Sequence, residues 1–319
     1  MQPLVMPLHS LVIPVYRNAD SIPDLLTAID GLHKALNGQL ETIFVIDGSP
    51  DHSHALLEEL LPATGLRAHV ILLSRNFGAF AAIRCGLEHA RGDYIAVMAA
   101  DLQEPPDLIL EFFSALHSKP IDVVFGQRLA RSDPGLGKFA SRLFWWLYRK
   151  FVQPDVPPGG VDIFAVTASF RDRLMRLSEA NSSLLGLLFW MGGRRLFIGY
   201  ERKERQHGKS AWTFKKKLTY LLDSIFAFSD LPVRVLMAVG LFGLVLAIGL
   251  AGIVLIMRLA SSYVVPGYAG TMLTILFFGA LNTFGIGIIG NYAWRAYENT
   301  KQRPLNIVLA QTDYPRSRK

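Results

Sequence analysis

Two aspartates follow apolar stretches of the kind that form buried β-strands. Asp101 ends the run YIAVMAA (94–100), and Asp47 ends the run ETIFVI (41–46). The carboxyl ends of strands in an open α/β sheet meet at one edge, where such sheets bind ligands. Gln103 lies two residues beyond Asp101, and a carboxylate with a carboxamide oxygen can hold a hard cation against a diphosphate. The spacing indicates nucleotide chemistry, although Asp47–Gly48 alone is equally typical of a tight turn.

The elements that position these residues alternate in type along the chain. Short apolar runs predict strands at residues 10–16, 41–47, 69–74, 94–100, 121–127, 161–167 and 194–202. Apolar residues at helical spacing predict helices at residues 22–36, 78–90, 106–117 and 169–192. Near-continuously apolar strands are expected where helices cover both faces of a sheet. Strands alternating with helices predict βαβ units and a mostly parallel sheet.

Two long uncharged runs follow this region. Hydrophobic residues make up 51% of the 319 residues and charged residues only 18%. A membrane-spanning helix needs about 20 apolar residues, and the sequence offers two such stretches in tandem, at about 233–257 and 270–293. Tandem runs favour a transmembrane hairpin over buried core helices. Residues 134–152 and 212–230 each mix aromatic and basic side chains, which is typical of helices that lie in the headgroup region.

The net charge of +7 is gathered around the two predicted spans. Lys215–Lys217 and Arg234 precede the first span, basic residues from Arg295 onward follow the second, and Arg258 alone lies near the loop between them. The positive-inside rule therefore predicts a multi-pass membrane hairpin with both termini in the cytoplasm. This topology explains the charge without a nucleic-acid partner. The single cysteine, Cys85, excludes a disulfide or a thiolate metal site.

Four segments resemble family-2 glycosyltransferases of the polyprenyl-phosphate type: LVIPVYRNADSI, FVIDGSPDHS, the run from LSRNFGAF to QEPPDLI, and RQHGKSAWTFKKK. The similarity is to dolichyl-phosphate mannose synthases and bactoprenol glucosyltransferases, and the C-terminal region resembles the two-span anchor of the bactoprenol branch. It covers residues 8–308, and Ser74 to Pro106 is the most specific part. The resemblance implies an α/β fold with a GT-A-like, mostly parallel sheet covered by helices on both faces. Amphipathic helices and a two-helix transmembrane hairpin would follow.

The resemblance also implies a domain organisation and an activity. A cytoplasmic GT-A-like glycosyltransferase domain is expected at 1–210, a juxtamembrane amphipathic segment at 211–232, two transmembrane helices within 233–294, and a basic cytoplasmic tail at 295–319. The implied reaction moves a sugar from a nucleotide diphosphate sugar to a polyprenyl, undecaprenyl-like phosphate. It inverts the anomeric carbon and depends on Mg²⁺ or Mn²⁺. The family's habit and small-residue stripes on the spans predict a homo-oligomer in the lipid bilayer.

The resemblance assigns the family's functional roles to the positions that match its motifs. The implied donor-binding residues are Pro14, Tyr16, Asp47, Gly48, Arg75, Arg205, Lys209 and Ser210. Asp101 and Gln103 are the implied metal ligands, and Asp101 is also counted as catalytic. Asp162 matches the carboxylate that acts as acid or base or orients the acceptor. Arg128 and Arg131 are expected to face the acceptor phosphate.

Two positions depart from the family pattern. Ile46 and Ala99 stand where the family usually has aspartates. These departures sustain an alternative hypothesis, a catalytically weak, membrane-anchored nucleotide-sugar-binding or scaffold subunit. A processive polysaccharide synthase is disfavoured because its Gln-x-x-Arg-Trp signature does not occur. A dehydrogenase is excluded because the one G-x-G-x-x-G pattern, at 285–290, lies inside a predicted span.

Overall fold

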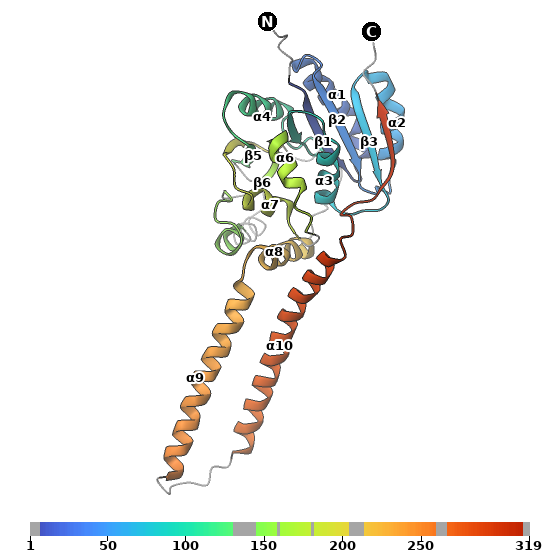
Figure 1. Cartoon of the computed structure of the whole chain (residues 1–319). Coiled ribbons are helices and arrows are strands. Elements are labelled where there is room, and N and C mark those ends of the chain that lie inside the picture. Colours follow the sequence, from blue (N-terminus) through green and yellow to red (C-terminus); the bar gives the residue numbers. More distant parts are fainter. Residues whose placement is uncertain are drawn as a thin grey trace.

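The computed structural model describes residues 7–129, 145–157, 160–179, 182–203, 214–259 and 267–314. Its strands are β1 (His9–Val15), β2 (Leu40–Ile46), β3 (Arg67–Leu73), β4 (Tyr94–Val97), β5 (Val123–Arg128), β6 (Val161–Thr167), β7 (Arg195–Tyr200) and β8 (Val308–Tyr314). They form one eight-stranded sheet in the order β7-β5-β6-β4-β1-β2-β3-β8 (Figure 1). Strands β1 to β4 are mutually parallel, and β5 is parallel to β7. Strands β6 and β8 run antiparallel to their neighbours.

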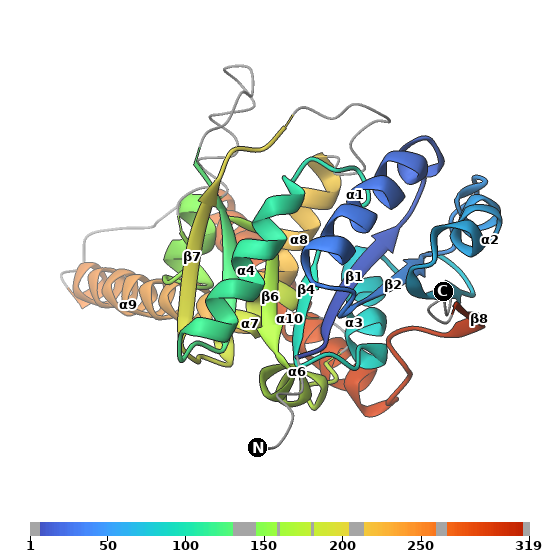
Figure 2. The same ribbon diagram turned by 90° about the horizontal axis from the view of Figure 1, so that it is seen from above.

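Helices cover both faces of this sheet. The helices α1 (Ile22–Ala35), α2 (Ser53–Thr64) and α4 (Pro106–Ser118) pack in one hydrophobic cluster. The helices α3 (Ala79–His89), α6 (Ala168–Met175) and α7 (Leu184–Trp190) pack in a second cluster. Figure 2 shows the helices on either side of the strands. The expected mostly parallel sheet with helices on both faces is therefore confirmed.

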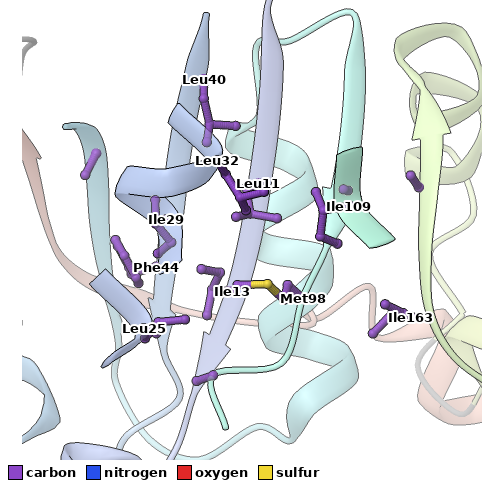
Figure 3. Packing of buried hydrophobic residues seen from close by; sticks show 14 of the residues in the cluster. Leu11, Ile13, Leu25, Ile29, Leu32, Leu40, Phe44, Met98, Ile109 and Ile163 are labelled. Carbon is purple, nitrogen blue, oxygen red and sulfur yellow. The ribbon is translucent and has the colours of Figure 1, made fainter. Parts of the chain in front are cut away.

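Alternation along β1 explains why the sheet has two cores. Leu11 and Ile13 belong to the cluster of α1, whereas Val12 belongs to the cluster of α3. Figure 3 shows Leu11 and Ile13 among Ile29 of α1 and Phe44 of β2, and all four side chains are fully buried. Burying one such side chain stabilises the fold by about 1.5–3 kcal/mol. Strands that are apolar on both faces are thus fixed in register by both helical layers.

Three further helices lie between β7 and β8 in the chain, and the last two of them are long. Helix α8 (Phe214–Phe228) lies across the end of the domain, and α9 (Leu231–Leu259) and α10 (Tyr268–Thr300) project away from it (Figure 1). Segments Leu231–Gly249 and Gly270–Thr300 are long and apolar enough to cross a membrane, and only 6% of each apolar stretch is buried against the chain. Their apolar side chains face outward, as Met237 and Phe242 show with 68% and 70% exposure.

The structure differs from the sequence-based expectation in four elements, the first of which is helix α2, where no helix is predicted. The predicted helix at 169–192 is instead two helices, because α6 ends at Met175 and the Ser183 hydroxyl accepts from Gly186 N to begin α7. Strand β4 ends at Val97, three residues before the end of its apolar run, where the chain turns toward Asp101. Strand β8 was not predicted at all. Of the aromatic and basic stretch at 134–152, the described part is helical over 145–151, and residues 134–144 lie outside the described residues.

Candidate functional site

The carboxyl ends of five strands carry the residues that the sequence singled out. Pro14 lies in β1 and Tyr16 follows it, while Asp47 and Gly48 follow β2. Arg75 follows β3, and the Asp101–Gln103 pair follows β4. Arg128 is the last residue of β5. Because β1 to β4 are parallel and in register, these positions share one edge of the sheet.

Asp47 joins the end of β2 to the segment 74–78 between β3 and α3. We call this segment the donor loop because it carries Arg75, a predicted donor-binding residue. The two carboxylate oxygens of Asp47 accept hydrogen bonds from Phe77 N at 2.7 Å and from Gly78 N at 2.9 Å. Burial raises the pKa of the Asp47 carboxyl, although these two donors and the charge of Arg75 act to lower it. The side chain is 2% exposed. In this structure Asp47 therefore holds the donor loop rather than presenting its oxygens to solvent.

Gly48 allows the same two strand ends to approach each other. Its φ is +56°, a conformation that side chains rarely adopt. A Cβ atom there would lie 2.3 Å from the carbonyl carbon of Arg75. Only glycine fits between β2 and the donor loop, and Arg75 is placed by that contact. The Arg75 guanidinium lies 4.0 Å from the centroid of the Phe77 ring on the same loop.

A second set of hydrogen bonds ties the end of β1 to the segment after Gly48. Asp51 accepts from the Ser49 hydroxyl at 2.6 Å, from the Ser53 hydroxyl at 2.9 Å and from Ala19 N at 3.0 Å. Burial alone would raise the pKa of the Asp51 carboxyl, but these donors lower it. Ser49 in turn accepts from Arg17 N, next to Tyr16. Sequence reasoning missed this role of Asp51; the Ser-Pro-Asp-His-Ser run before α2 was the available signal.

The Asp101 segment contains a backbone conformation that is uncommon for its residue type. Leu102, between Asp101 and Gln103, has a φ of +52°, which is sparsely populated for a residue with a branched side chain. Gln103 N donates to Asp101 Oδ1 at 3.4 Å. The Gln103 side-chain amide donates to Lys203 O at 3.3 Å, and Lys203 N donates back to Gln103 O at 2.9 Å. The segment after β7 is therefore fastened to the Asp101 segment.

The buried side chain of Glu104 adds an ion pair between the same two segments. It is 1% exposed, and its Oε1 lies 3.5 Å from Nε of Arg202. Glu104 is not among the residues that the sequence singled out. Its pairing with a residue almost one hundred positions away could not be read from local sequence.

Several predicted residues fall outside what the structure describes. Arg131, Arg205, Lys209 and Ser210 lie outside the described residues. Asp162 is described for its backbone alone, as the second residue of β6. Because Val161 pairs with Gln127 near the end of β5, Asp162 lies toward the edge that holds Arg128. The functional roles of all these residues remain predictions.

The chemistry of Asp101 and Gln103 can be tested against the needs of a divalent cation. Among the residues that the structure describes, no group of three or more His, Cys, Asp or Glu side chains could hold a metal. Carboxylate and carboxamide oxygens suit hard cations, and Mg²⁺ is commonly bound by one or two carboxylates together with substrate phosphates. The pair therefore fits a cation that the substrate completes, not a closed protein site.

Comparison with known proteins adds independent information. Residues 10–175 match the model of the family described as glycosyl transferase family 2. The chain is 30% identical over 302 residues to the bactoprenol glucosyl transferase of Shigella phage SfV, covering 94% of this chain and 97% of that one. It is 29% identical to the prophage bactoprenol glucosyl transferase homolog of Escherichia coli K12, covering 94% of this chain and 97% of that one. A crystal structure of glucosyl-3-phosphoglycerate synthase from Mycobacterium tuberculosis matches with a TM-score of 0.48 at 18% identity, covering 68% of this chain and 80% of that one.

Proposed function

The chain belongs to glycosyl transferase family 2, and from this premise we propose that it transfers a sugar from a nucleotide diphosphate sugar to a polyprenyl phosphate, with inversion. The observation that carries this proposal is an arrangement: the strand-end residues Asp47, Arg75, Asp101 and Gln103 share one sheet edge in a domain that continues into two span-length helices. The relatives named bactoprenol glucosyl transferases match over nearly their whole length, including these helices. A soluble donor and a membrane lipid could meet at such a domain.

On the donor side, this chain's residues would bind and orient the diphosphate. Asp101 and Gln103 would hold Mg²⁺ or Mn²⁺, which when bound stabilises negative charge on the departing diphosphate as a Lewis acid. Arg75 stands on the donor loop that Asp47 and Gly48 fix, so its charge has a defined place near the strand ends. Fixed positive charge of this kind stabilises a leaving group as charge develops. Arg205, Lys209 and Ser210 are proposed to close over the same group.

On the acceptor side, little base catalysis is needed. A phosphate monoester has a second pKa of about 6, so at neutral pH its oxygen is already a nucleophile. We assign Asp162 to orienting the acceptor, or to taking its remaining proton, and Arg128 and Arg131 to holding its phosphate. An oxygen of that phosphate would attack the anomeric carbon from the face opposite the diphosphate, which inverts the configuration.

The helices would keep the domain beside its acceptor. We propose that α9 and α10 form a multi-pass anchor in the inner membrane, with the catalytic domain and both termini cytoplasmic, and that α8 lies at the inner leaflet. Basic side chains near a leaflet favour anionic headgroups. Gly243 of α9 lies beside Phe278 of α10 within the chain. We propose that other small residues along the spans allow close helix packing in a homo-oligomer.

The test is transfer of radiolabelled sugar into the organic phase. Membranes containing the full chain and undecaprenyl phosphate would be screened against a panel of nucleotide sugars with Mg²⁺ or Mn²⁺. Asp101→Ala should lower transfer by about 10²–10³-fold, the usual effect of losing one group that stabilises developing charge. Glu111→Ala removes an exposed carboxylate from α4 and should leave transfer unchanged. Wild-type rates in Asp101→Ala would overturn the site assignment.

Ile46 and Ala99 favour one second candidate function, a membrane-anchored nucleotide-sugar-binding subunit. Ile46 is fully buried in the cluster of α1, so this position presents no carboxylate to a donor. Calorimetry with the same nucleotide sugars separates the two functions. Binding of a donor without transfer to any lipid phosphate would favour the binding subunit.

A further inference from the structure

The C-terminal strand returns from the second long helix to complete the sheet. After α10 ends at Thr300, residues 301–307 lead into β8, which pairs antiparallel with β3 from Ala68–Tyr314 to Leu73–Val308 (Figure 1). Most of its side chains are exposed, and Leu309 is 66% exposed. Apolar burial therefore contributes little to holding β8 in place, and other contacts must do so.

A row of polar and charged side chains crosses four strands and ends on β8. Ser10, Glu41 and Arg67 occupy paired positions on β1, β2 and β3, and His69 pairs with Asp313 of β8. Glu41 is fully buried, and its Oε2 lies 3.7 Å from His69 Nε2. The other ring nitrogen, Nδ1, lies 2.7 Å from Asp313 Oδ1. His69 thus stands between a buried carboxylate of the core and a carboxylate of the C-terminal strand.

The start of this C-terminal segment touches the donor loop. Ser74 N donates to Ile307 O at 2.9 Å, immediately before β8 begins. Ser74 is the first residue of the loop that carries Arg75, and Asp47 holds the far end of that loop at Phe77 and Gly78. The donor loop is therefore held at one end by β2 and at the other by the segment that arrives from α10.

We propose that residues 307–314 act as a C-terminal latch, in which the Glu41–His69–Asp313 row fastens β8 to β3 and Ile307 thereby positions the donor loop. Asp313 and His69 are then positioning residues for donor binding, and this part of the inference rests on the proposed function. The latch links the donor side of the domain to the helix that enters the proposed anchor. Opening the latch frees the backbone of Ser74 and loosens the placement of Arg75.

The charges in the row give the latch a pH dependence. The groups facing His69 are Glu41 and Asp313, with Arg67 beside Glu41 and Arg91 near both carboxylates. Glu41, and then Asp313, raise the pKa of His69 against the opposing effect of burial. A raised pKa means that the stabilisation is complete below the ordinary value and is lost as pH rises through the raised one. The latch is therefore strongest in mildly acidic to neutral solution and opens toward alkaline pH.

Hydrogen exchange of the full chain in detergent micelles tests the latch without any donor. In Asp313→Ala, the protection of residues 308–314 should fall by about tenfold, as expected for losing a hydrogen bond to a charged group. The peptide that contains Ser74 should also exchange faster. Asp313→Glu should restore protection in both places, and the matched control Glu111→Ala should change neither. In the wild type, protection of 308–314, corrected for intrinsic exchange, should fall between pH 6 and pH 9.

Three results decide the proposal. Unchanged protection of β8 in Asp313→Ala, or protection independent of pH in the wild type, would show that the charge row is no latch. Opening of β8 without faster exchange at Ser74 would refute the link to the donor loop.

In transfer assays, Asp313→Ala should raise the KM for the donor with little change in kcat. A wild-type protein that transfers no sugar would refute the proposed function, while hydrogen exchange still judges the latch.

Discussion

At the scale of single residues, Asp47 and Gly48 act together on the donor loop. The Asp47 carboxylate accepts from the backbone at one end of the loop, and Gly48 leaves room for the backbone of Arg75. Neither role needs a ligand. The sequence pattern Asp-Gly was equally typical of a tight turn and of a nucleotide pocket, and in this structure it is a turn that holds the segment carrying Arg75.

Gly48→Ala should damage the donor loop more than it damages the fold. The added methyl group meets backbone atoms at 2.3 Å and requires a left-handed conformation, which costs about 1–3 kcal/mol. We expect donor affinity, measured by calorimetry, to fall with this displacement. Gly31→Ala is the matched control, because nothing lies within 4 Å of its added Cβ and the site is within α1. That variant should gain about 0.5–1 kcal/mol of stability. Equal donor affinity in the two variants would contradict the role given to Gly48.

Residue identities at the site were easier to predict than their contacts. The strand-end rule placed Asp47 and Asp101 at one edge because each follows an apolar run, whereas Arg75 was predicted only from the family resemblance. Asp51 accepts a hydrogen bond from Ala19 N, and Glu104 pairs with Arg202. These partners are brought near by tertiary folding alone, so no local pattern predicts them. The left-handed Leu102 was equally hidden, because leucine rarely adopts that conformation.

At the scale of elements, the buried end of β2 should control acid stability. The Glu41 carboxyl is fully buried, and burial alone would raise its pKa. Its neighbours instead lower that pKa to about 2, through the cation of His69, the hydroxyl of Ser10, the amide of Arg91 and the guanidinium of Arg67. Because the folded pKa lies below the ordinary one, the stabilisation is present above about pH 4.5 and is lost as pH falls toward 2.

Glu41→Gln should remove this stabilisation at neutral pH. A pKa lowered from 4.5 to about 2 corresponds to about 3 kcal/mol, at 1.36 kcal/mol for each unit. Urea unfolding of the full chain, followed by tryptophan fluorescence, should show a loss of that order at pH 7 and a smaller loss at pH 3. Glu111→Gln, an exposed carboxylate on α4, should show neither. An equal loss at both pH values would mean that packing, not charge, is what Glu41 contributes.

The strands that are buried on both faces were the most predictable elements. Strands β1 to β3 were predicted to within two residues at each end, because both faces are apolar and leave a continuous signal. The boundary between α6 and α7 was missed, although the polar run Ser-Glu-Ala-Asn-Ser-Ser (178–183) and the capping residue Ser183 were signals for it. Strand β8, VLAQTDY, has mostly exposed side chains and pairs with a strand more than two hundred residues earlier. Its position depends on register and on Asp313 meeting His69, and neither can be read from a single segment.

At the scale of the whole molecule, the ends of the long helices are fastened to the domain on the side of α8. Arg295 of α10 lies 2.5 Å from Asp223 of α8, and the Tyr292 hydroxyl donates to Ser229 O at 3.4 Å. Continuing from Tyr292, α10 reaches Thr300 after about 12 Å, at 1.5 Å for each residue. The chain therefore leaves the domain at residue 230 and returns to it nearby, with both helices in between.

This geometry permits a comparison that separates anchoring from the latch. Replacing residues 231–300 by a Gly/Ser linker of about 12 residues, which spans about 19 Å, keeps β8 in the chain. Truncation after residue 230 removes β8 as well. We expect the linker variant to bind donor like the full chain and to lose transfer to full-length polyprenyl phosphate. The truncated variant should also lose donor affinity, because Ser74 no longer meets Ile307. Equal donor affinity in the two variants would show that β8 does not support the donor loop.

The place of β8 in the sequence sets an order of assembly during synthesis. The segment that pairs with β3 is translated only after both long helices, so the ribosome has made α9 and α10 before the sheet can be completed. Until then β3 is an unpaired edge, and such edges invite association with other chains. Larger proteins expose aggregation-prone surface in just such intermediates. The sheet can thus be completed only after α9 and α10 have been synthesised. A chain whose synthesis stops within these helices leaves the edge of β3 open, and chaperones and proteases can recognise it.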